Sequence, residues 1–414
     1  MGWISQIQNI TVKIRRQISE ATTAPGMVMI SLSAVALGAA FGGYLPLISL
    51  WMETFNISFQ RIGIVCGAAA LGVVSSAYFA PKLAAKYGYI VTINAGLIVA
   101  AIMTIAFRFT DNYGLWLVFR FVSGLGLGLH WVLTEAWLAN IVAEKYRTRV
   151  MAIYATAISI GFAVGPVVIW LFGALSIIPF IIMGGLLILA AIPILKLKGL
   201  EPKDTQTHSA SPLILIKRAP TVASACVVVG SVDLALISLL PAMITRTPEA
   251  APILALIIVP AMALGATSLQ YPIAILADKY GLRKVGVITV CAGLIFASLI
   301  PFFLGSIFVT LIFGFLAAGL VYALYSIGLA MLSRRFSGAE IVAANAGFVI
   351  LFELSNLMGP WVAGFLLDIN MRLGLPIFTL SIGVFYVTIS WICLLYTSDA
   401  ADEGLGVDLG GRRI

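Results

Sequence analysis

The sequence predicts an all-α membrane protein, with twelve transmembrane helices in two pseudo-symmetric six-helix bundles and both termini in the cytoplasm. Three observations lead to this fold: the composition, the spacing of the apolar runs and the positions of the basic residues. Hydrophobic residues make up 61% of the 414 and charged residues only 10%, against about 45–50% and about 25% in soluble domains. A soluble protein of this size could not bury so much apolar surface, so the chain faces lipid.

The apolar runs set the predicted spans, because one crossing of a bilayer takes about 20 residues. Residues 1–25 are polar and basic and lack the apolar core of a cleavable signal peptide. We therefore expect an uncleaved chain with a cytoplasmic N-terminal segment at 1–25. The predicted spans are 27–51, 62–84, 89–108, 113–140, 149–172, 175–196, 220–244, 252–276, 285–304, 306–333, 342–368 and 375–396.

The longest internal polar segment separates two groups of six spans. It reads KLKGLEPKDTQTHSASPLILIKRAP, and its Ser, Thr, Pro and mixed charge are typical of a linker. We therefore expect an N-terminal bundle at 26–196, a cytoplasmic linker at 197–219 and a C-terminal bundle at 220–396. The polar, glycine-rich residues 397–414 are unlike the spans, and we interpret them as a tail of non-native sequence.

The basic residues predict the orientation of the chain. An even number of spans puts both termini on one side of the membrane. With the N-terminus inside, the inner segments carry 18 Lys and Arg residues and the outer segments four. Cytoplasmic loops concentrate Lys and Arg, so this excess favours cytoplasmic termini. The net charge of +8 then reflects loops that face the anionic inner leaflet, and it does not call for a nucleic acid partner.

The two halves also resemble each other in sequence. Three short motifs of the first half recur in the second half in the same order and at nearly the same distance along the sequence, which indicates a duplication. Parallel six-helix repeats of this kind belong to a known transporter architecture. The matching segments are AKYG at 85–88 and DKYG at 278–281, AGLI at 95–98 and 292–295, and GP at 165–166 and 359–360.

The loop after the eighth span, AILADKYGLRKV, carries an acid followed by basic residues around a glycine. It is similar to the inner-loop motif of the major facilitator superfamily, which the chain resembles up to about residue 396. The equivalent first-half loop, PKLAAKYGYI, departs from the motif, because Ala85 stands where the acid should be. The motif residues that match in the second half are Asp278, Lys279, Gly281, Arg283 and Lys284.

Two further motifs of the same family lie in the first half. Arg120, Gly124 and Gly126 in the fourth span match its buried-arginine motif. Within the superfamily, the stretch LTEAWLANIVAEKYRTRVMAIY looks most like the YcaD-like branch. The helix-5 motif, which the family associates with antiporters, is matched at Gly161, Gly165 and Pro166, although Ile169 and Trp170 replace its following glycine pair.

The resemblance implies a secondary active transporter that works by alternating access. It would be a multi-pass protein of the bacterial inner (plasma) membrane and a monomer. Its partners would be a small-molecule substrate, protons and the lipid bilayer, with no nucleic acid, metal or cofactor. In the resembled fold, helices 1, 4, 7 and 10 line a central cavity.

Five ionisable residues lie well inside the predicted spans: Arg120, His130 and Glu135 in the fourth, Asp233 in the seventh and Glu353 in the eleventh. Four of the five therefore fall on helices that line the cavity in the resembled fold. An ionised side chain at the bilayer centre costs at least about 2.5–3.5 kcal/mol. A hydrated cavity removes most of this cost, so these five residues form the predicted substrate and proton site.

Each of these side chains also has a structural alternative. Arg120 keeps its charge, and it either binds an anionic solute or makes a fixed structural pair. His130 is either a proton relay or a packed neutral histidine. Glu135 either contacts the solute or pairs with Arg147 or Arg149 near the cytoplasmic end of its helix.

Asp233 is the predicted proton carrier, because it lies in the middle of its span with no basic neighbour in the sequence. Glu353 has the same chemistry on the eleventh span. The two acids favour proton coupling. The helix-5 motif, which is associated with antiporters, favours export, and the predicted function is therefore proton-coupled export of a small organic or amphipathic compound. The alternative is proton symport of a small organic anion, with Arg120 as its anchor.

Two other classes of protein compete with a transporter. An enzyme is disfavoured because the sequence has only two histidines and lacks the HExxH, GxSxG and GxxxxGK[ST] motifs of metal, serine and ATP chemistry. A transport-inactive membrane sensor on the same fold stays open. Loss of the motif acid at Ala85 mildly favours it.

Overall fold

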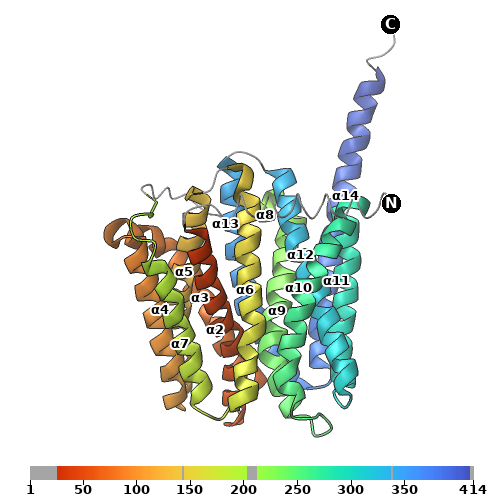
Figure 1. Ribbon diagram of the computed structural model, residues 1–414. Helices are drawn as coiled ribbons and strands as arrows, with labels where there is room; N and C mark the ends of the chain where they lie inside the picture. Colours follow the sequence, from red (N-terminus) through yellow and green to blue (C-terminus); the bar gives the residue numbers. More distant parts are fainter. Residues whose placement is uncertain (1–25, 142–143, 203–211, 337–338, 411–414) are drawn as a thin grey trace, which may run out of the picture. The chain divides into compact units, whose positions relative to one another are not determined.

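The computed structural model describes residues 26–141, 144–202, 212–336 and 339–410, and the regular elements in these ranges are helices (Figure 1). The chain forms two compact units that divide within the predicted linker, after Thr207. One segment departs from the order of the sequence. Asn56–Gly67, which the sequence places in the N-terminal bundle, groups with the second unit.

Unit 1 contains the helices of the first half. Within it, α2 packs against α6 and α7, and α4 packs against α5 and α7. The second part of α3, from Ala68 onward, also belongs to this unit. The helices are α2 (Met27–Glu53), α3 (Phe59–Tyr87), α4 (Tyr89–Ala106), α5 (Tyr113–Ile141), α6 (Glu144–Phe172) and α7 (Ile178–Leu195), with a short 3-10 helix at Phe107–Phe109.

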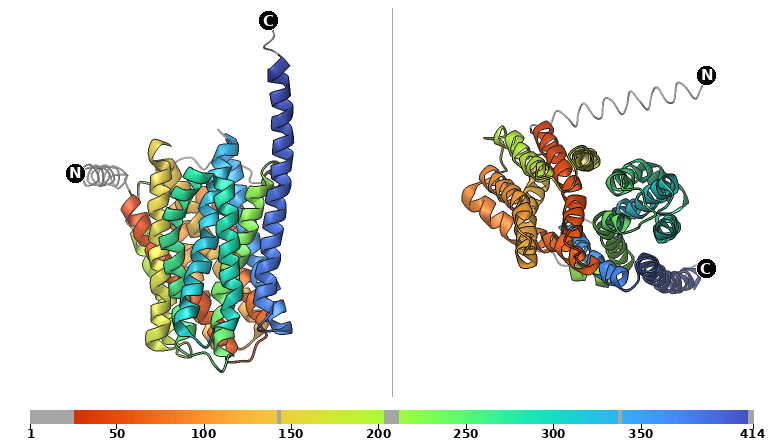
Figure 2. Two further views of the ribbon diagram at one scale, coloured as in Figure 1. Left: turned by 90° about the vertical axis from the view of Figure 1, so that its right-hand side faces the viewer. Right: turned by 90° about the horizontal axis from the view of Figure 1, so that it is seen from below.

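Unit 2 repeats this packing in the second half. α9 packs against α13 and α14, and α11 packs against α12 and α14. Figure 2 shows α10, α11 and α12 side by side in unit 2, as their contacts require. The helices are α8 (Pro212–Arg218), α9 (Pro220–Thr245), α10 (Leu254–Tyr280), α11 (Leu282–Leu299), α12 (Ile307–Arg335), α13 (Ala339–Ile369) and α14 (Gly374–Gly410), with a 3-10 helix at Ile300–Phe302.

The helices agree closely with the predicted spans. Eleven helices of the described residues are long and apolar enough to cross a membrane. In α6 only the shorter stretch Thr156–Phe172 is counted as apolar, so a full span at this helix stays a prediction. Two elements differ from the expectation: α8 forms inside the linker, and α14 continues as a helix to Gly410, past the predicted end at residue 396 (Figure 1). Ala400 and Ala401 favour helix in this extension, whereas Gly404, Gly406 and Gly410 do not, so propensity alone does not account for it.

The duplicated KYG motif adopts the same backbone in both units. Gly88 joins α3 to α4 with φ 84°, and Gly281 joins α10 to α11 with φ 98°. Each glycine donates its backbone N–H to the carbonyl four residues earlier, at 2.9 Å. Positive φ favours glycine because it has no Cβ. The sequence repeat therefore encodes the same glycine turn between two consecutive helices in each unit.

The helix-5 motif residues lie in a close contact between α2 and α6. A Cβ atom on Gly161 would lie 2.0 Å from the Val35 carbonyl oxygen, and one on Gly165 would lie 2.2 Å from that of Ala39. Gly38 and Gly42 of α2 are equally close to the backbone of α6. Two GxxxG patterns thus face each other, which lets the helix backbones approach closely in a membrane.

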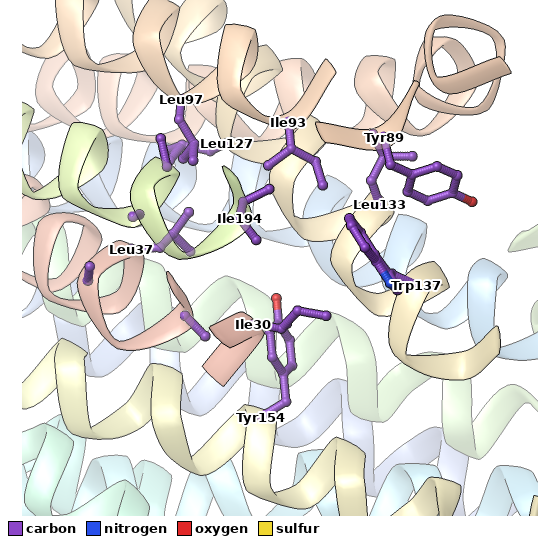
Figure 3. Close-up of a cluster of buried hydrophobic side chains, with 14 of the residues drawn as sticks. Ile30, Leu37, Tyr89, Ile93, Leu97, Leu127, Leu133, Trp137, Tyr154 and Ile194 are labelled. Carbon is purple, nitrogen blue, oxygen red and sulfur yellow. The ribbon is translucent and has the colours of Figure 1, made fainter. Parts of the chain in front are cut away.

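The core of unit 1 is apolar and draws on helices α2 to α7. Its side chains interdigitate around Ile30 and Leu37 of α2, Ile93 of α4 and Ile194 of α7, all 2% exposed or less (Figure 3). Polar atoms at its edge find partners. For example, the Trp137 indole N–H donates to the Leu200 carbonyl at 3.1 Å. This packing holds α5, which carries three of the predicted site residues, in a fixed rotation.

Candidate functional site

Unit 1 holds three of the five predicted site residues, at three levels along α5. Arg120 is 1% exposed, and its guanidinium carbon lies 5.1 Å from the ring centroid of Tyr44 in α2. A guanidinium over an aromatic face gains electrostatic energy from the ring, and this gain is larger where water is excluded. The arginine is therefore held against α2 within its own unit.

His130 lies deeper in unit 1, where three helices meet. Its Nε2 atom is 2.8 Å from the Ser33 Oγ in α2, and that hydroxyl lies 2.7 Å from the carbonyl of Ala190 in α7. A carbonyl can only accept, so the single Ser33 proton goes to Ala190 and the His130 Nε2–H donates to Ser33. This geometry corresponds to the packed-histidine alternative, since the ring joins α5 to α2 and α7.

Glu135 occurs one turn beyond Trp131, whose indole N–H donates to the Glu135 Oε1 at 2.6 Å. Next to it, the Thr134 hydroxyl donates to the carbonyl of His130 at 2.7 Å, so the Tyr154 hydroxyl of α6 must donate to Thr134 at 2.9 Å. The indole thus supplies Glu135 with a partner from its own helix. Pairing with Arg147 or Arg149 concerns side chains outside the described part of the chain.

Unit 2 holds the other two predicted residues. Asp233 of α9 and Glu353 of α13 lie on helices that pack against each other, and both helices contact α12, which carries Tyr322. Glu353 is 8% exposed, and its Oε2 accepts a weak hydrogen bond from the Asn356 amide at 3.4 Å. Asp233 is half-buried. The two acids therefore lie on neighbouring membrane-spanning helices of the same unit.

Aromatic side chains pack between α12 and α13 in unit 2. The rings of Tyr322 and Tyr325 stack with centroids 5.7 Å apart and planes 7° from parallel. Tyr325 also meets Phe348 and Phe352 of α13 edge to face, at 5.1 Å and 5.3 Å. Such contacts contribute about 0.5–1.5 kcal/mol each beyond area burial. They hold α12, which carries Tyr322, against α13, which carries Glu353.

The inner-loop motif lies at the end of α10, away from the acid pair. The Asp278 Oδ1 is 3.8 Å from an Arg334 nitrogen at the end of α12, and the two side chains are 75% and 66% exposed. Exposed pairs contribute about 0–1 kcal/mol to stability. In the described part of unit 1 the equivalent position, Ala85, is exposed and carries no acid.

Sequence reasoning missed several partners of the predicted residues. Ser33 bonds to His130, Tyr154 to Thr134 beside Glu135, and Asn356 to Glu353. Hydroxyl and amide residues are common in membrane helices, where they satisfy backbone groups of their own turn. The spacing alone therefore gave no reason to select these three.

The family model of the Major Facilitator Superfamily matches residues 30–248, which is more than half of the chain. The chain belongs to the major facilitator superfamily. It is accordingly a multi-pass membrane transporter and not an enzyme.

Relatives within the superfamily cover most of the chain. The uncharacterized MFS-type transporter YfkF of Bacillus subtilis is 25% identical over 357 residues, which are 82% of this chain and 86% of the relative. The uncharacterized MFS-type transporter YcaD of Salmonella enteritidis is 23% identical over 359 residues, with 83% and 87% covered. The chain is thus most like the YcaD branch.

Solved transporters share the fold. A point mutant of nucleoside transporter NupG superposes with a TM-score of 0.73 at 15% identity, over 89% of this chain and 99% of that one. A bacterial homolog of the human lysosomal transporter Spinster, in an inward-facing and occupied conformation, gives 0.72 at 16% identity, over 90% and 96%. At these identities the likeness concerns the fold alone.

Proposed function

We propose that this transporter exports a small organic or amphipathic compound in exchange for protons, by alternating access across the bacterial inner membrane. The observation that carries the proposal is that Asp233 of α9 and Glu353 of α13, which is 8% exposed, lie inside two membrane-spanning helices that pack against each other in unit 2. Asp233 exchanges the coupling proton, and Glu353 modulates this exchange from the neighbouring helix. The termini lie in the cytoplasm, in line with the distribution of basic residues.

The charges around the acid pair support proton exchange. α9 and α13 contain no Lys or Arg, and α12 contains them only in its last turn, at Arg334 and Arg335. Two carboxylates without a cation on these three helices repel each other and are poorly solvated. A proton is the simplest group that neutralises them. Releasing it on one side of the membrane and taking it up on the other couples transport to the proton gradient.

The glycine contacts of α6 support export over uptake. Gly161 and Gly165 match a motif that the superfamily associates with antiporters, and they allow α6 to pack directly on the backbone of α2. Pro166 follows in the same helix, where it removes a backbone hydrogen bond and permits a bend. A helix of this kind can change its curvature as the transporter opens.

A second candidate rests on Arg120. Arg120 is 1% exposed. A permanent charge buried inside a membrane protein is costly in free energy, and such residues commonly mark a substrate pathway. In this alternative Arg120 anchors a small organic anion, which enters together with a proton. The direction of proton movement relative to solute separates this symport from export.

Reconstitution into liposomes tests the proposal. Thermal-shift screening of organic compounds across a pH series first selects a ligand, and a pH dye trapped in the liposomes then reports proton movement. We expect a gradient of the ligand to drive proton flux in the opposite direction. Proton flux in the same direction as the ligand would support the symporter, and binding without any flux would support a sensor.

A further inference from the structure

The short helix α8 lies between the two halves of the sequence, but it belongs to unit 2. Only Ala219 separates it from α9, which is long and apolar enough to cross a membrane. Ala219 has φ −144° and ψ 59°, and Pro220 follows it. The residue before a proline is disfavoured in the helical region, so the chain bends here and α8 does not prolong the span. One residue reaches at most about 3.6 Å, which places α8 at the end of α9, where lipid headgroups meet water.

One face of α8 is packed on the ends of α12 and α13. It consists of Ile214, Leu215 and Arg218, which lie on one side of the helix because Arg218 follows the other two by four and three residues. Leu215 is 0% exposed in an apolar cluster that includes Phe336, and Ile214 packs against this cluster. The Arg218 guanidinium donates to the Glu340 Oε1 at 2.9 Å, and its carbon lies 5.2 Å from the ring centroid of Phe336. These contacts fix the rotation of α8 within unit 2.

The opposite face of α8 is apolar and uncovered. Leu213 and Ile216 are three residues apart, and they are 59% and 49% exposed. In a membrane-spanning helix such exposure means contact with lipid, as at Val384 of α14, which is 67% exposed. Two aliphatic side chains held open to water cost free energy, whereas the boundary between headgroups and acyl chains accommodates them. The environment that fits this face of α8 is therefore the bilayer surface.

Exposed cations surround the uncovered face. Lys217 follows Ile216 directly, and two arginines come directly before Phe336, the ring that Arg218 contacts. The described acids that pair with these cations are Glu340 and Asp278, so positive charge is in excess. Basic segments at a membrane surface attract anionic lipids. The exposed cations at this end of unit 2 are Lys217, Arg218, Arg334 and Arg335.

We propose that α8 lies on the membrane surface, where Leu213 and Ile216 insert between lipids and Lys217 binds the headgroup of an anionic phospholipid. The packed face fixes the rotation of the helix, so the two aliphatic side chains and the lysine are presented together. A lysine has a long apolar stem with its charge at the tip, which suits a place where acyl chains and headgroups meet. The end of the linker is thereby anchored to the bilayer beside α9.

Fluorescence quenching distinguishes lipid from water around this face. The full chain is reconstituted in nanodiscs with its four native cysteines replaced by alanine, and Leu213→Cys or Ile216→Cys carries a bimane label. Bromine on the lipid acyl chains quenches a label in the bilayer, and iodide quenches a label in water. Val384→Cys is the lipid reference, and Glu249→Cys, in an exposed position between α9 and α10, is the water reference.

The first expected result concerns the depth of the two aliphatic side chains. Brominated lipid should quench the label of Leu213→Cys and of Ile216→Cys about threefold more strongly than that of Glu249→Cys, because an interfacial helix buries its apolar face among the acyl chains. Iodide should quench the three labels in the opposite order. Because these measurements need neither substrate nor protons, the result is independent of the proposed coupling.

The second expected result concerns the anionic headgroup. The nanodiscs contain equal parts of phosphatidylcholine and phosphatidylglycerol, with bromine on the acyl chains of one or the other. Brominated phosphatidylglycerol should quench the label of Leu213→Cys about twofold more than brominated phosphatidylcholine, since Lys217 attracts the anionic lipid. Lys217→Gln should make the two lipids quench equally, and Lys217→Arg should keep the preference. Lys86→Gln, which removes an exposed lysine of unit 1, is the matched control and should also keep it.

Three results would overturn the proposal. One is iodide quenching of Leu213→Cys and Ile216→Cys as strong as that of Glu249→Cys, which would place this face of α8 in water. Another is quenching by neither reagent, which would show that another part of the protein covers the face. The third is equal quenching by the two lipids before Lys217 is changed.

Discussion

The Nε2 atom of His130 lies 2.8 Å from the Oγ of Ser33, and the hydroxyl of Ser33 is itself committed to the carbonyl of Ala190. The imidazole therefore acts as a donor that joins α5 to α2, and through Ser33 to α7. Its role in this arrangement is to hold the bundle of unit 1 together.

The first prediction follows from this bond. His130→Gln keeps a side-chain N–H donor and should retain proton-driven transport, whereas His130→Ala should lower the free energy of unfolding by about 1–3 kcal/mol, because Ser33 loses its donor in a buried place. Thermal unfolding in detergent and flux in liposomes measure the two effects. Loss of coupling in His130→Gln, with normal stability, would instead make His130 a proton relay.

The close contact of α2 with α6 gives a second prediction. Gly165→Ala places a methyl group 2.2 Å from the Ala39 carbonyl oxygen, and overpacking of this kind costs about 1–3 kcal/mol. Gly185→Ala in α7 is the matched control, because nothing lies within 4 Å of its Cβ position. We expect a lower melting temperature and slower transport only in Gly165→Ala. Equal behaviour of the two variants would show that α2 and α6 have room to separate.

A third prediction concerns Arg120 and Tyr44. Replacing the ring by Tyr44→Leu, or the planar guanidinium by Arg120→Lys, should each lower stability. A double-mutant cycle should give a coupling energy of about 0.5–2 kcal/mol, the range of a buried cation–π contact. Thermal unfolding of the four proteins supplies the cycle. Additive effects would mean that the two side chains do not stabilise each other.

The sequence was sufficient to predict much of the helical architecture, because lipid imposes simple rules. About 20 apolar residues are needed for each crossing, and the predicted ends of α9 and α2 agree with the structure to within two residues. The KYG repeat indicated a duplication, and the structure gives both copies the same turn, in which Gly88 and Gly281 have positive φ. Polar linkers give weaker signals, which is why α8 was not predicted.

The site was harder to predict than the fold. Counting charges in the spans selected Asp233 and Glu353, but the packing of α9 against α13 depends on how the helices are rotated and placed, which the hydropathy pattern does not determine. The segment Asn56–Gly67 shows the same limit. It groups with unit 2, where the carboxylate of Asp368 accepts hydrogen bonds from Phe59 and Gln60, and nothing local in the sequence relates these residues.

Proton exchange by Asp233 is the central claim, and ligand-driven proton flux in liposomes tests it most directly. Asp233→Asn keeps the size of the side chain but cannot ionise, so proton flux should vanish while ligand binding persists. Glu249→Gln, which removes an exposed acid of the same unit, should leave the flux unchanged. Normal proton flux in Asp233→Asn would contradict the account.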